Sequence, residues 1–325
     1  MNLIYFHRNL SAGYSLNKVT QTIIRDVPDK VEYFAPLAGA SLRALVQNFF
    51  FVWKNRKKNA INHVTGDIHY CILALIGCKS VLTIHDTVSL DYNQLPPIKR
   101  LIIEYLWFRL PLKLATKVVC ISESTKKHVE CYTKRKDIVV IHNAIDPHFV
   151  EEPLHTRNDV PTVLLIGTSS NKNLVRTFEA LKGQNCKVVI VGKLSKEQLE
   201  ALDDNHINYI NKVGLTDAQI FEEYKNCDIV SFISLFEGFG MIVVEANKVG
   251  RPVICSDIPV LKEVAGDSAL LVNPCDVEDM RKGFEKMFSD DLLRKSLIKR
   301  GFENAKRFDA DNIRKQWMDF YRSIS

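Results

Sequence analysis

The sequence predicts an α/β fold in which each half of the chain forms its own parallel sheet. Short apolar, β-branched runs alternate with longer helical segments in both halves, which is the pattern of parallel strands joined by helices. Between the halves, residues 142–153 are rich in turn formers and contain two prolines, as expected at a domain boundary. The 325 residues are enough for two domains of ordinary size.

The predicted elements follow in order along the chain. In the first half, strands are expected near residues 2–6, 31–35, 61–64, 80–84, 117–121 and 137–141, with helices such as 40–57, 98–115 and 122–133 between them. In the second half, strands are expected near residues 161–166, 187–191, 207–210, 228–233, 252–255 and 269–272. A helical tail follows, in which Trp317, Phe320 and Tyr321 form an apolar stripe. The expected domains are therefore 1–149 and 150–308, with 309–325 as a closing helix.

The composition is that of a globular protein, with 46% hydrophobic and 25% charged residues. A run of 18 uncharged apolar residues, which a membrane-spanning helix requires, does not occur, and a strand begins at once, so we expect a cytoplasmic protein. The eight cysteines include no C-x-x-C pair and several fall in apolar strands, which indicates reduced core residues. The net charge of +6 permits an anionic ligand or membrane surface without identifying one.

The most informative stretch is 231–250, which reads as a buried strand, a glycine turn and a helix. Gly238 and Gly240 bracket Phe239, so the backbone can bend tightly there and approach a ligand closely. The helix is expected to begin near Met241 and to stop at Gly250. The N–H groups of residues 239–241 at its start predict a phosphate site.

Two acids frame this turn. Glu237 precedes the glycines, and Glu245 lies on the second helical turn. One of the two carboxylates can lie beside the group that is attached to a phosphate. The second carboxylate can lie deeper by one helical turn, where a ribose would be bound. A nucleotide-sugar has its groups in that order. These two residues alone are equally compatible with an ordinary strand–helix turn that carries two solvated glutamates.

Ligands of parallel sheets bind at the carboxyl ends of strands, and three places in the first half attract attention for that reason. Gly13 follows the first strand, His85 ends the strand near 80–84, and Ser122 or Ser124 begins a helix. Each also has a structural interpretation, as a turn glycine, a core histidine or an N-cap. A G-x-G-x-x-G motif does not follow the first strand, which disfavours a dinucleotide oxidoreductase.

Two further histidines, His63 and His69, are expected only to line a cleft. In the second half, Gly167, Lys172 and Asn173 follow a strand at the start of a helix. An ammonium group there can reach a diphosphate, and the helix N-terminus adds its partial positive charge.

The segments FEGFGM, EA, GRPVI and KEVAGDSALLVNP together resemble the donor-site signature of the retaining family 4 glycosyltransferases. The resemblance covers most of the second half and scattered segments of the first. It implies the GT-B fold, in which two Rossmann-like domains face a cleft and the last helix crosses back to the first domain. It also implies transfer of a sugar from a UDP- or GDP-sugar to a saccharide or lipid-linked acceptor hydroxyl with retention, in bacterial surface polysaccharide biosynthesis.

The resemblance assigns roles residue by residue. Catalytic roles fall to Glu237, which would hold sugar hydroxyls, to His85, which would contact the donor sugar, and to Lys172, which would stabilise the departing diphosphate. Glu245 would bind the ribose, and backbone near Val213 and Gly214 would read the base. The implied donor-binding residues are Gly13, Gly167, Thr168, Lys172, Val213, Gly238, Phe239, Gly240, Met241 and Glu245.

Many relatives have arginine where this chain has Thr168, so diphosphate neutralisation should depend on Lys172 and the helix amides, unless Lys193 or Arg251 compensates. Neither a D-x-D loop nor a metal-ligand cluster is evident in the sequence, and we expect no metal or other cofactor. Nucleic acid is not an expected partner.

Some alternatives remain open. Segments 45–59 and 98–117 mix aromatic and basic residues, and they are either core helices with charged ends or a peripheral membrane surface. A sugar-nucleotide epimerase or phosphorylase of the same fold, or a non-catalytic subunit of a polysaccharide assembly complex, would share much of this pattern.

Overall fold

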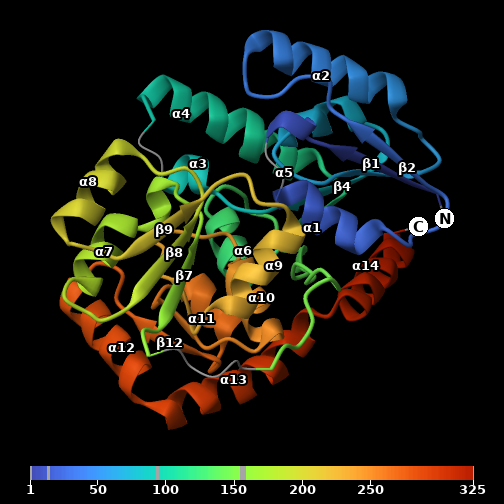
Figure 1. Ribbon diagram of the computed structural model, residues 1–325. Coiled ribbons are helices and arrows are strands. Elements are labelled where there is room, and N and C mark those ends of the chain that lie inside the picture. The colour runs from blue at the N-terminus through green and yellow to red at the C-terminus, as the bar shows by residue number, and fades with distance from the viewer. Residues whose placement is uncertain (1, 13–14, 93–94, 154–158, 325) are drawn as a thin grey trace. The chain divides into compact units, whose positions relative to one another are not determined.

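The computed structural model describes residues 2–12, 15–92, 95–153 and 159–324, so the predicted contact at Gly13 lies outside the described residues. The chain divides into two compact units. Unit 1 comprises residues 1–146 and 309–325, and unit 2 comprises residues 147–308. Figure 1 shows the elements of each unit.

The described part of unit 1 contains a six-stranded parallel sheet with the order β2-β1-β3-β4-β5-β6. Its strands are β1 (Leu3–His7), β2 (Lys30–Phe34), β3 (Ile61–Val64), β4 (Lys79–Ile84), β5 (Lys117–Cys120) and β6 (Ile138–Val140). The helical elements are η1 (Leu10–Ala12), α1 (Ser15–Ile24), α2 (Leu42–Asn55), η2 (His69–Leu75), α3 (Val88–Asp91), α4 (Pro97–Ile103), the π-helix η3 (Glu104–Arg109), α5 (Leu110–Leu114), α6 (Glu123–Glu130) and α14 (Ala310–Ile324).

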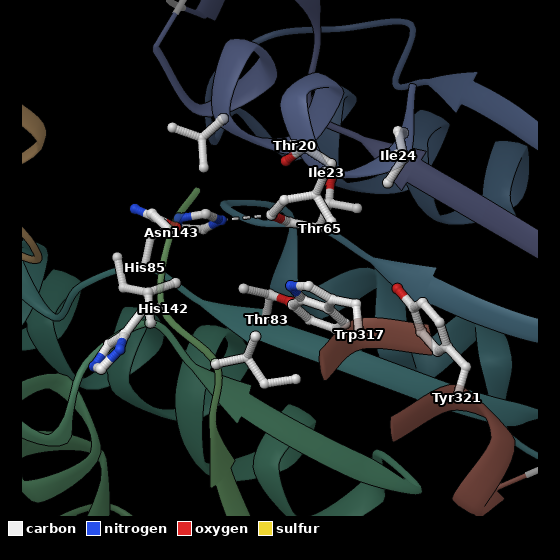
Figure 2. A pocket seen from close by; sticks show the side chains of 13 residues that line it. Thr20, Ile23, Ile24, Thr65, Thr83, His85, His142, Asn143, Trp317 and Tyr321 are labelled. Carbon is white, nitrogen blue, oxygen red and sulfur yellow. Dashed lines mark hydrogen bonds between the residues drawn. The ribbon is translucent and has the colours of Figure 1, made fainter. Parts of the chain in front are cut away.

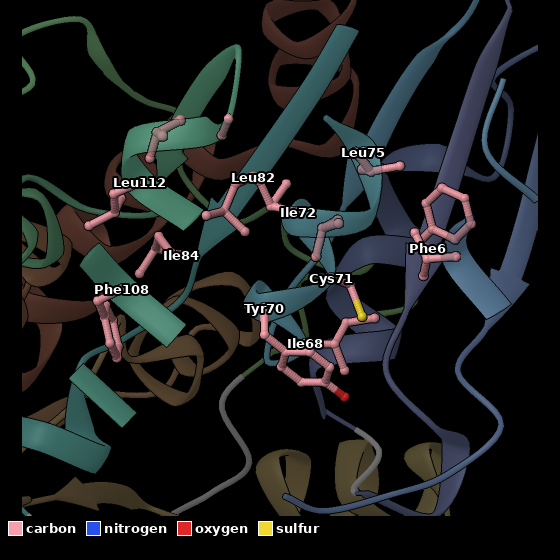
Figure 3. Packing of buried hydrophobic residues seen from close by; sticks show 14 of the residues in the cluster. Phe6, Ile68, Tyr70, Cys71, Ile72, Leu75, Leu82, Ile84, Phe108 and Leu112 are labelled. Carbon is pink, nitrogen blue, oxygen red and sulfur yellow. The ribbon is translucent and has the colours of Figure 1, made fainter. Parts of the chain in front are cut away.

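Alternate residues of these strands build two different cores because successive side chains of a strand point to opposite faces. Ile4 and Phe6 belong to a cluster on one face, which α2, η2 and α5 help to build (Figure 3). Leu3 and Tyr5 belong to a second cluster, on the face covered by α1 and α14. Both faces of the sheet are therefore covered, as is usual for parallel strands joined by helices.

Helix α14 packs against α1, and the predicted apolar stripe at Trp317, Phe320 and Tyr321 is buried. The Tyr321 hydroxyl lies 2.7 Å from Nδ1 of His63, whose Nε2 lies 2.7 Å from the Thr83 hydroxyl. His63 is thus a buried core residue that ties the closing helix to the sheet. Its expected place in a cleft lining was wrong.

The predicted helix at 98–115 is divided into α4, the π-helix and α5. Proline has no N–H, so Pro111 cannot donate to the carbonyl of Trp107 as a continuous α-helix would require. His69 supplies the missing bond, because its Nδ1 lies 3.0 Å from that carbonyl oxygen. His69 is also buried, so its expected place in a cleft lining was wrong as well.

The described part of unit 2 contains a second six-stranded parallel sheet, with the order β12-β11-β10-β7-β8-β9. Its strands are β7 (Thr162–Ile166), β8 (Lys187–Val191), β9 (Tyr209–Lys212), β10 (Ile229–Phe232), β11 (Val253–Ser256) and β12 (Ala269–Val272). The helical elements are η4 (Ser170–Lys172), α7 (Leu174–Leu181), α8 (Lys196–Asp204), α9 (Asp217–Asn226), α10 (Met241–Val249), α11 (Pro259–Ala265), α12 (Val277–Ser289), α13 (Asp291–Ala305) and η5 (Lys306–Phe308).

All twelve predicted strands are present, and no end differs from its predicted position by more than two residues. The strand order of unit 2 is that of a Rossmann fold, with the order reversing between β7 and β10. In such sheets the crevice for a ligand forms at the carboxyl ends of the two strands where the order reverses. The loops after β7 and β10 are therefore the place to look for a site.

Candidate functional site

The loop after β7 places a lysine against a glycine. Gly167 has φ +90°, and a Cβ there would lie 3.0 Å from Cε of Lys172. The lysine side chain therefore folds back across the glycine, and its Nζ lies 4.4 Å from the centre of the Phe232 ring at the end of β10. The lysine ends the short helix η4, directly before Asn173 begins α7.

The loop after β10 meets this lysine. Nζ of Lys172 donates to Oε1 of Glu237 at 2.6 Å, and both side chains are largely buried, at 16% and 13% exposure. Asn171 donates to the Phe236 carbonyl at 2.9 Å and to Glu237 at 3.3 Å. The sequence analysis missed Asn171, which holds the two loops together. The only indication in the sequence was that Asn171 lies next to Lys172 in a turn.

Helix α10 begins immediately after Glu237 and the glycine turn. Gly240 is its N-cap residue, with φ +111°, and a Cβ there would lie 2.6 Å from Cδ2 of Leu261. Only glycine suits both the conformation and the space. Phe239 is buried and packs against Phe308, with ring centres 5.5 Å apart, so this contact holds the glycine turn against unit 2. The predicted helix start at Met241 and its end at Gly250 are confirmed.

Lys172, Glu237 and the start of α10 thus lie together where the strand order of unit 2 reverses. The first N–H groups of a helix have no carbonyl partner within the helix, and they carry its partial positive charge. With the ammonium group of Lys172 beside them, they form a site suited to an anion such as a phosphate. Glu237 adds an acceptor for hydroxyl groups at the same place.

Glu245 lies on α10, half-buried, and the Tyr224 hydroxyl donates to its Oε2 at 2.7 Å. Tyr224 on α9 is fully buried, and burial together with the charge of Glu245 raises the pKa of its hydroxyl well above the ordinary value. The phenol therefore stays protonated and orients the carboxylate. The sequence analysis missed Tyr224, which looked like any apolar position of an amphipathic helix.

The cations proposed to compensate for Thr168 differ in position. Thr168 donates its hydroxyl to the Lys193 carbonyl at 2.7 Å, and the Lys193 side chain is exposed. Arg251 is 1% exposed and is held by backbone carbonyls of unit 2, so its guanidinium group serves the fold.

Val213, whose backbone was expected to contact the base of the nucleotide, is 60% exposed in the loop after β9.

His85 follows β4 in unit 1 and lines a small cavity of about 20 Å³ beneath α1 (Figure 2). Its Nε2 donates to the Thr65 carbonyl at 2.7 Å, which fixes the neutral tautomer with a lone pair on Nδ1. Nδ1 is buried and has no hydrogen-bond partner among the residues that the structure describes. Nearby, Ser122 caps α6 by accepting from the Thr125 N–H at 2.9 Å, so the N-cap interpretation is correct.

Burial lowers the pKa of His85 to about 4, although its bond to the Thr65 carbonyl opposes this shift. As the pH falls below 6.5, the unfolded chain binds a proton that the folded protein excludes until about pH 4, so this histidine destabilises the fold by about 2 kcal/mol at pH 5. We expect His85→Gln to reduce the loss of unfolding free energy between pH 7 and pH 5, measured by urea denaturation. The matched change at the exposed His206, to Asn, should leave that loss unchanged.

A second polar groove, of about 220 Å³, lies in unit 1 at the carboxyl ends of β1 and β3, between which the strand order of this sheet also reverses. Arg8 donates to Asp67 at 3.1 Å within it. Asn9, Ser89, Leu37, Ile103 and Trp107 are among its other lining residues. The sequence analysis did not identify this groove.

Among the residues that the structure describes, groups of three or more His, Cys, Asp or Glu side chains placed to hold a metal ion are absent. None of the helices formed by those residues combines the length and the apolar run needed to cross a bilayer. All eight cysteines are free, and five of them are buried.

Comparison with known proteins identifies the family of the chain. Residues 151–304 match the family described as Glycosyl transferases group 1, and residues 13–149 match Glycosyltransferase Family 4. The chain therefore belongs to the family 4 glycosyltransferases, and its fold is GT-B. The protein is therefore a glycosyltransferase.

The chain is 25% identical over 317 residues to an uncharacterized glycosyltransferase of Methanocaldococcus jannaschii, covering 94% of this chain and 86% of that protein. It is 36% identical over 91 residues to the O-antigen chain mannosyltransferase B of Escherichia coli, covering 28% of this chain and only 24% of that protein. The structure of Anabaena HepE in complex with UDP-glucose is similar with a TM-score of 0.82 and 15% identity, covering 99% of this chain and 100% of that one.

Proposed function

We propose that this protein transfers a sugar from a nucleotide-sugar to an acceptor hydroxyl with retention, in the synthesis of a bacterial surface polysaccharide. The observation that carries the proposal is the meeting of Lys172, Glu237 and the N-terminus of α10 at the point where the strand order of unit 2 reverses. An anion site with an adjacent hydroxyl acceptor suits a diphosphate joined to a sugar. The similarity to an O-antigen mannosyltransferase supports the polysaccharide pathway, and the similarity to a UDP-glucose complex supports the donor class.

In the proposed complex, the diphosphate lies against the amides at the start of α10 and the ammonium group of Lys172. Negative charge develops on the diphosphate as its bond to the anomeric carbon breaks, so donors already in place stabilise the transition state. Glu237 accepts hydrogen bonds from sugar hydroxyls. Glu245, oriented by Tyr224, accepts them from the ribose, and the backbone near Val213 meets the base.

In unit 1, Nδ1 of His85 has a lone pair and no donor within the described part of the chain, so we assign it to a hydroxyl of the donor sugar. The groove around Arg8 and Asp67 is assigned to the acceptor. It offers ionic groups, an amide and an indole, Trp107, and such a mixture suits a saccharide, which presents both hydroxyl edges and apolar ring faces.

The chemistry requires no further group. The acceptor oxygen forms a bond to the anomeric carbon on the face that the diphosphate leaves, and a phosphate oxygen takes the acceptor proton. The products are the glycoside and the nucleoside diphosphate. Since Lys172 and the helix amides supply positive charge, we propose that transfer is independent of a divalent metal, and activity retained in EDTA would agree with this.

Replacing Glu237 with Gln is expected to lower transfer by about 10- to 100-fold, because a hydrogen bond to a charged group contributes roughly 1.5–3 kcal/mol. A thermal-shift panel of UDP- and GDP-sugars identifies the donor first, since a ligand that binds the folded state raises its stability. Transfer is then measured with that donor and purified acceptor glycans, with Glu285→Gln on the exposed face of α12 as the matched control.

Product analysis separates the alternatives. A transferase releases the nucleoside diphosphate only when an acceptor is present, whereas an epimerase converts the donor alone. Unchanged transfer by the Glu237→Gln variant would remove the proposed role of this carboxylate, and donor conversion without acceptor would replace the proposed reaction.

A further inference from the structure

The outward face of α2 carries a row of large apolar side chains. Leu42, Val46, Phe50 and Trp53 are 77%, 47%, 59% and 52% exposed. They are spaced by four, four and three residues, so they lie along one side of the helix. A row of this length on one helix is more than the scattered apolar residues of an ordinary protein surface.

The core of unit 1 does not need this row, because the opposite side of α2 already faces it. Ala44, Asn48 and Val52 are fully buried, and Asn48 donates to the Tyr70 hydroxyl at 2.9 Å. Tyr70 and its neighbours in the buried cluster are drawn in Figure 3. The core-helix interpretation of this segment therefore describes its inner side only.

Positively charged residues lie at both ends of the row. Residues 33–66 contain five cationic side chains and no acidic one. These are Arg43, Lys54, Arg56, Lys57 and Lys58. Arg56 lies over the Trp53 ring, 4.7 Å from its centre, so charge and aromatic surface are joined at the end of the helix.

Helix α4 repeats the arrangement on the same side of the sheet. Ile98, Leu101, Ile102 and Tyr105 are exposed at helical spacing, on and directly after α4. Phe49 of α2 and Ile103 of α4 both pack against the buried cluster shown in Figure 3, which places the two helices over the same face (Figure 1).

We propose that unit 1 binds the surface of a bilayer that contains anionic lipids, with α2 and α4 lying in the interface. The lysines and arginines attract anionic headgroups, and the aromatic and aliphatic row enters the boundary between headgroups and acyl chains. Residues 33–66 combine five cations, no acidic residue and an exposed apolar row on one helix, which is the pattern of a helix that lies on an anionic bilayer surface.

Vesicle sedimentation tests this with the full chain. Wild-type protein should pellet with phosphatidylcholine vesicles that contain phosphatidylglycerol at low salt, and remain in solution with phosphatidylcholine alone or at high salt. Replacing Lys54, Lys57 and Lys58 with Glu should lower the partition coefficient at least about tenfold. The matched control replaces the exposed Lys286, Lys295 and Lys299 of unit 2 with Glu, which changes the net charge equally.

The apolar row is tested separately. Phe50→Ser with Trp53→Ser should also lower retention about tenfold, whereas Leu292→Ser, at a side chain of unit 2 that is 80% exposed, should not. Circular dichroism checks that each variant is folded. The proposal is overturned if wild-type protein stays in solution with phosphatidylglycerol vesicles at low salt, or if the control triple variant loses as much retention as the α2 variant.

Discussion

Replacing Lys172 with alanine is expected to lower sugar transfer by about a hundred- to a thousandfold, the usual effect of removing a group that stabilises charge in the transition state. The side chain is 16% exposed, it is held by Glu237 at 2.6 Å, and it lies at the carboxyl ends of β7 and β10. Thr168 carries no positive charge, and Arg251 is occupied by carbonyls. The measurement is kcat/KM with the donor identified by thermal shift.

A second measurement separates a direct role of Lys172 from the mere support of Glu237. If the ammonium group binds the diphosphate, the Lys172→Ala variant should also lose the thermal shift produced by UDP or GDP. A variant that retains this shift while losing transfer would show that Lys172 acts only through Glu237. Lys182→Ala, at an exposed lysine at the other end of α7, is the matched control and should change neither quantity substantially.

Replacing Arg251 with methionine should destabilise unit 2 by roughly 3 kcal/mol or more, because each buried carbonyl left without a donor costs about 1–3 kcal/mol. The guanidinium group is 1% exposed and donates to six backbone carbonyls at 2.9 to 3.2 Å. These carbonyls belong to Glu152, Pro153, Tyr224, Lys225, Val249 and Gly250. One side chain therefore joins the entry into unit 2, the end of α9 and the end of α10.

The positions of the tryptophans allow a specific measurement. The protein has three, Trp53, Trp107 and Trp317, and all belong to unit 1. During urea unfolding, circular dichroism of the Arg251→Met variant should begin to fall at lower urea than tryptophan fluorescence does. The control Arg322→Met, at an exposed arginine of α14, should leave both transitions in place. An unchanged dichroism midpoint for Arg251→Met would contradict the structural role.

Some features of the site were readable from the sequence because they are local. The turn that begins α10 requires glycine at residue 240, and Ser122 is a good N-cap because its side chain bonds three residues ahead. Glu237 and Lys172 were singled out by their positions beside such turns. The pattern could not show that they bond each other, since 65 residues separate them.

Other features depend on residues that are distant in the chain. Tyr224 orients Glu245 from another helix, and His63 was misassigned because its partner Tyr321 lies 258 residues away. A histidine near a strand end has the same local sequence whether it meets a ligand or a core tyrosine. The sequence analysis expected one continuous helix at 98–115, although Pro111 lies within it. Only the fold showed the π-helix at 104–109 and the bond from His69 to the Trp107 carbonyl.

By itself, the sequence determined the twelve strands, the two-unit α/β organisation, the glycine turn before α10 and the family. These follow from hydrophobic period, β-branching and turn chemistry, which act over a few residues. The tertiary structure decided that Lys172 and Glu237 meet at the proposed anion site, that Arg251 serves the fold, and that one side of α2 is buried while the other is exposed. Those facts depend on packing between distant segments, and a side chain's burial and partners are fixed only when the sheets and helices come together.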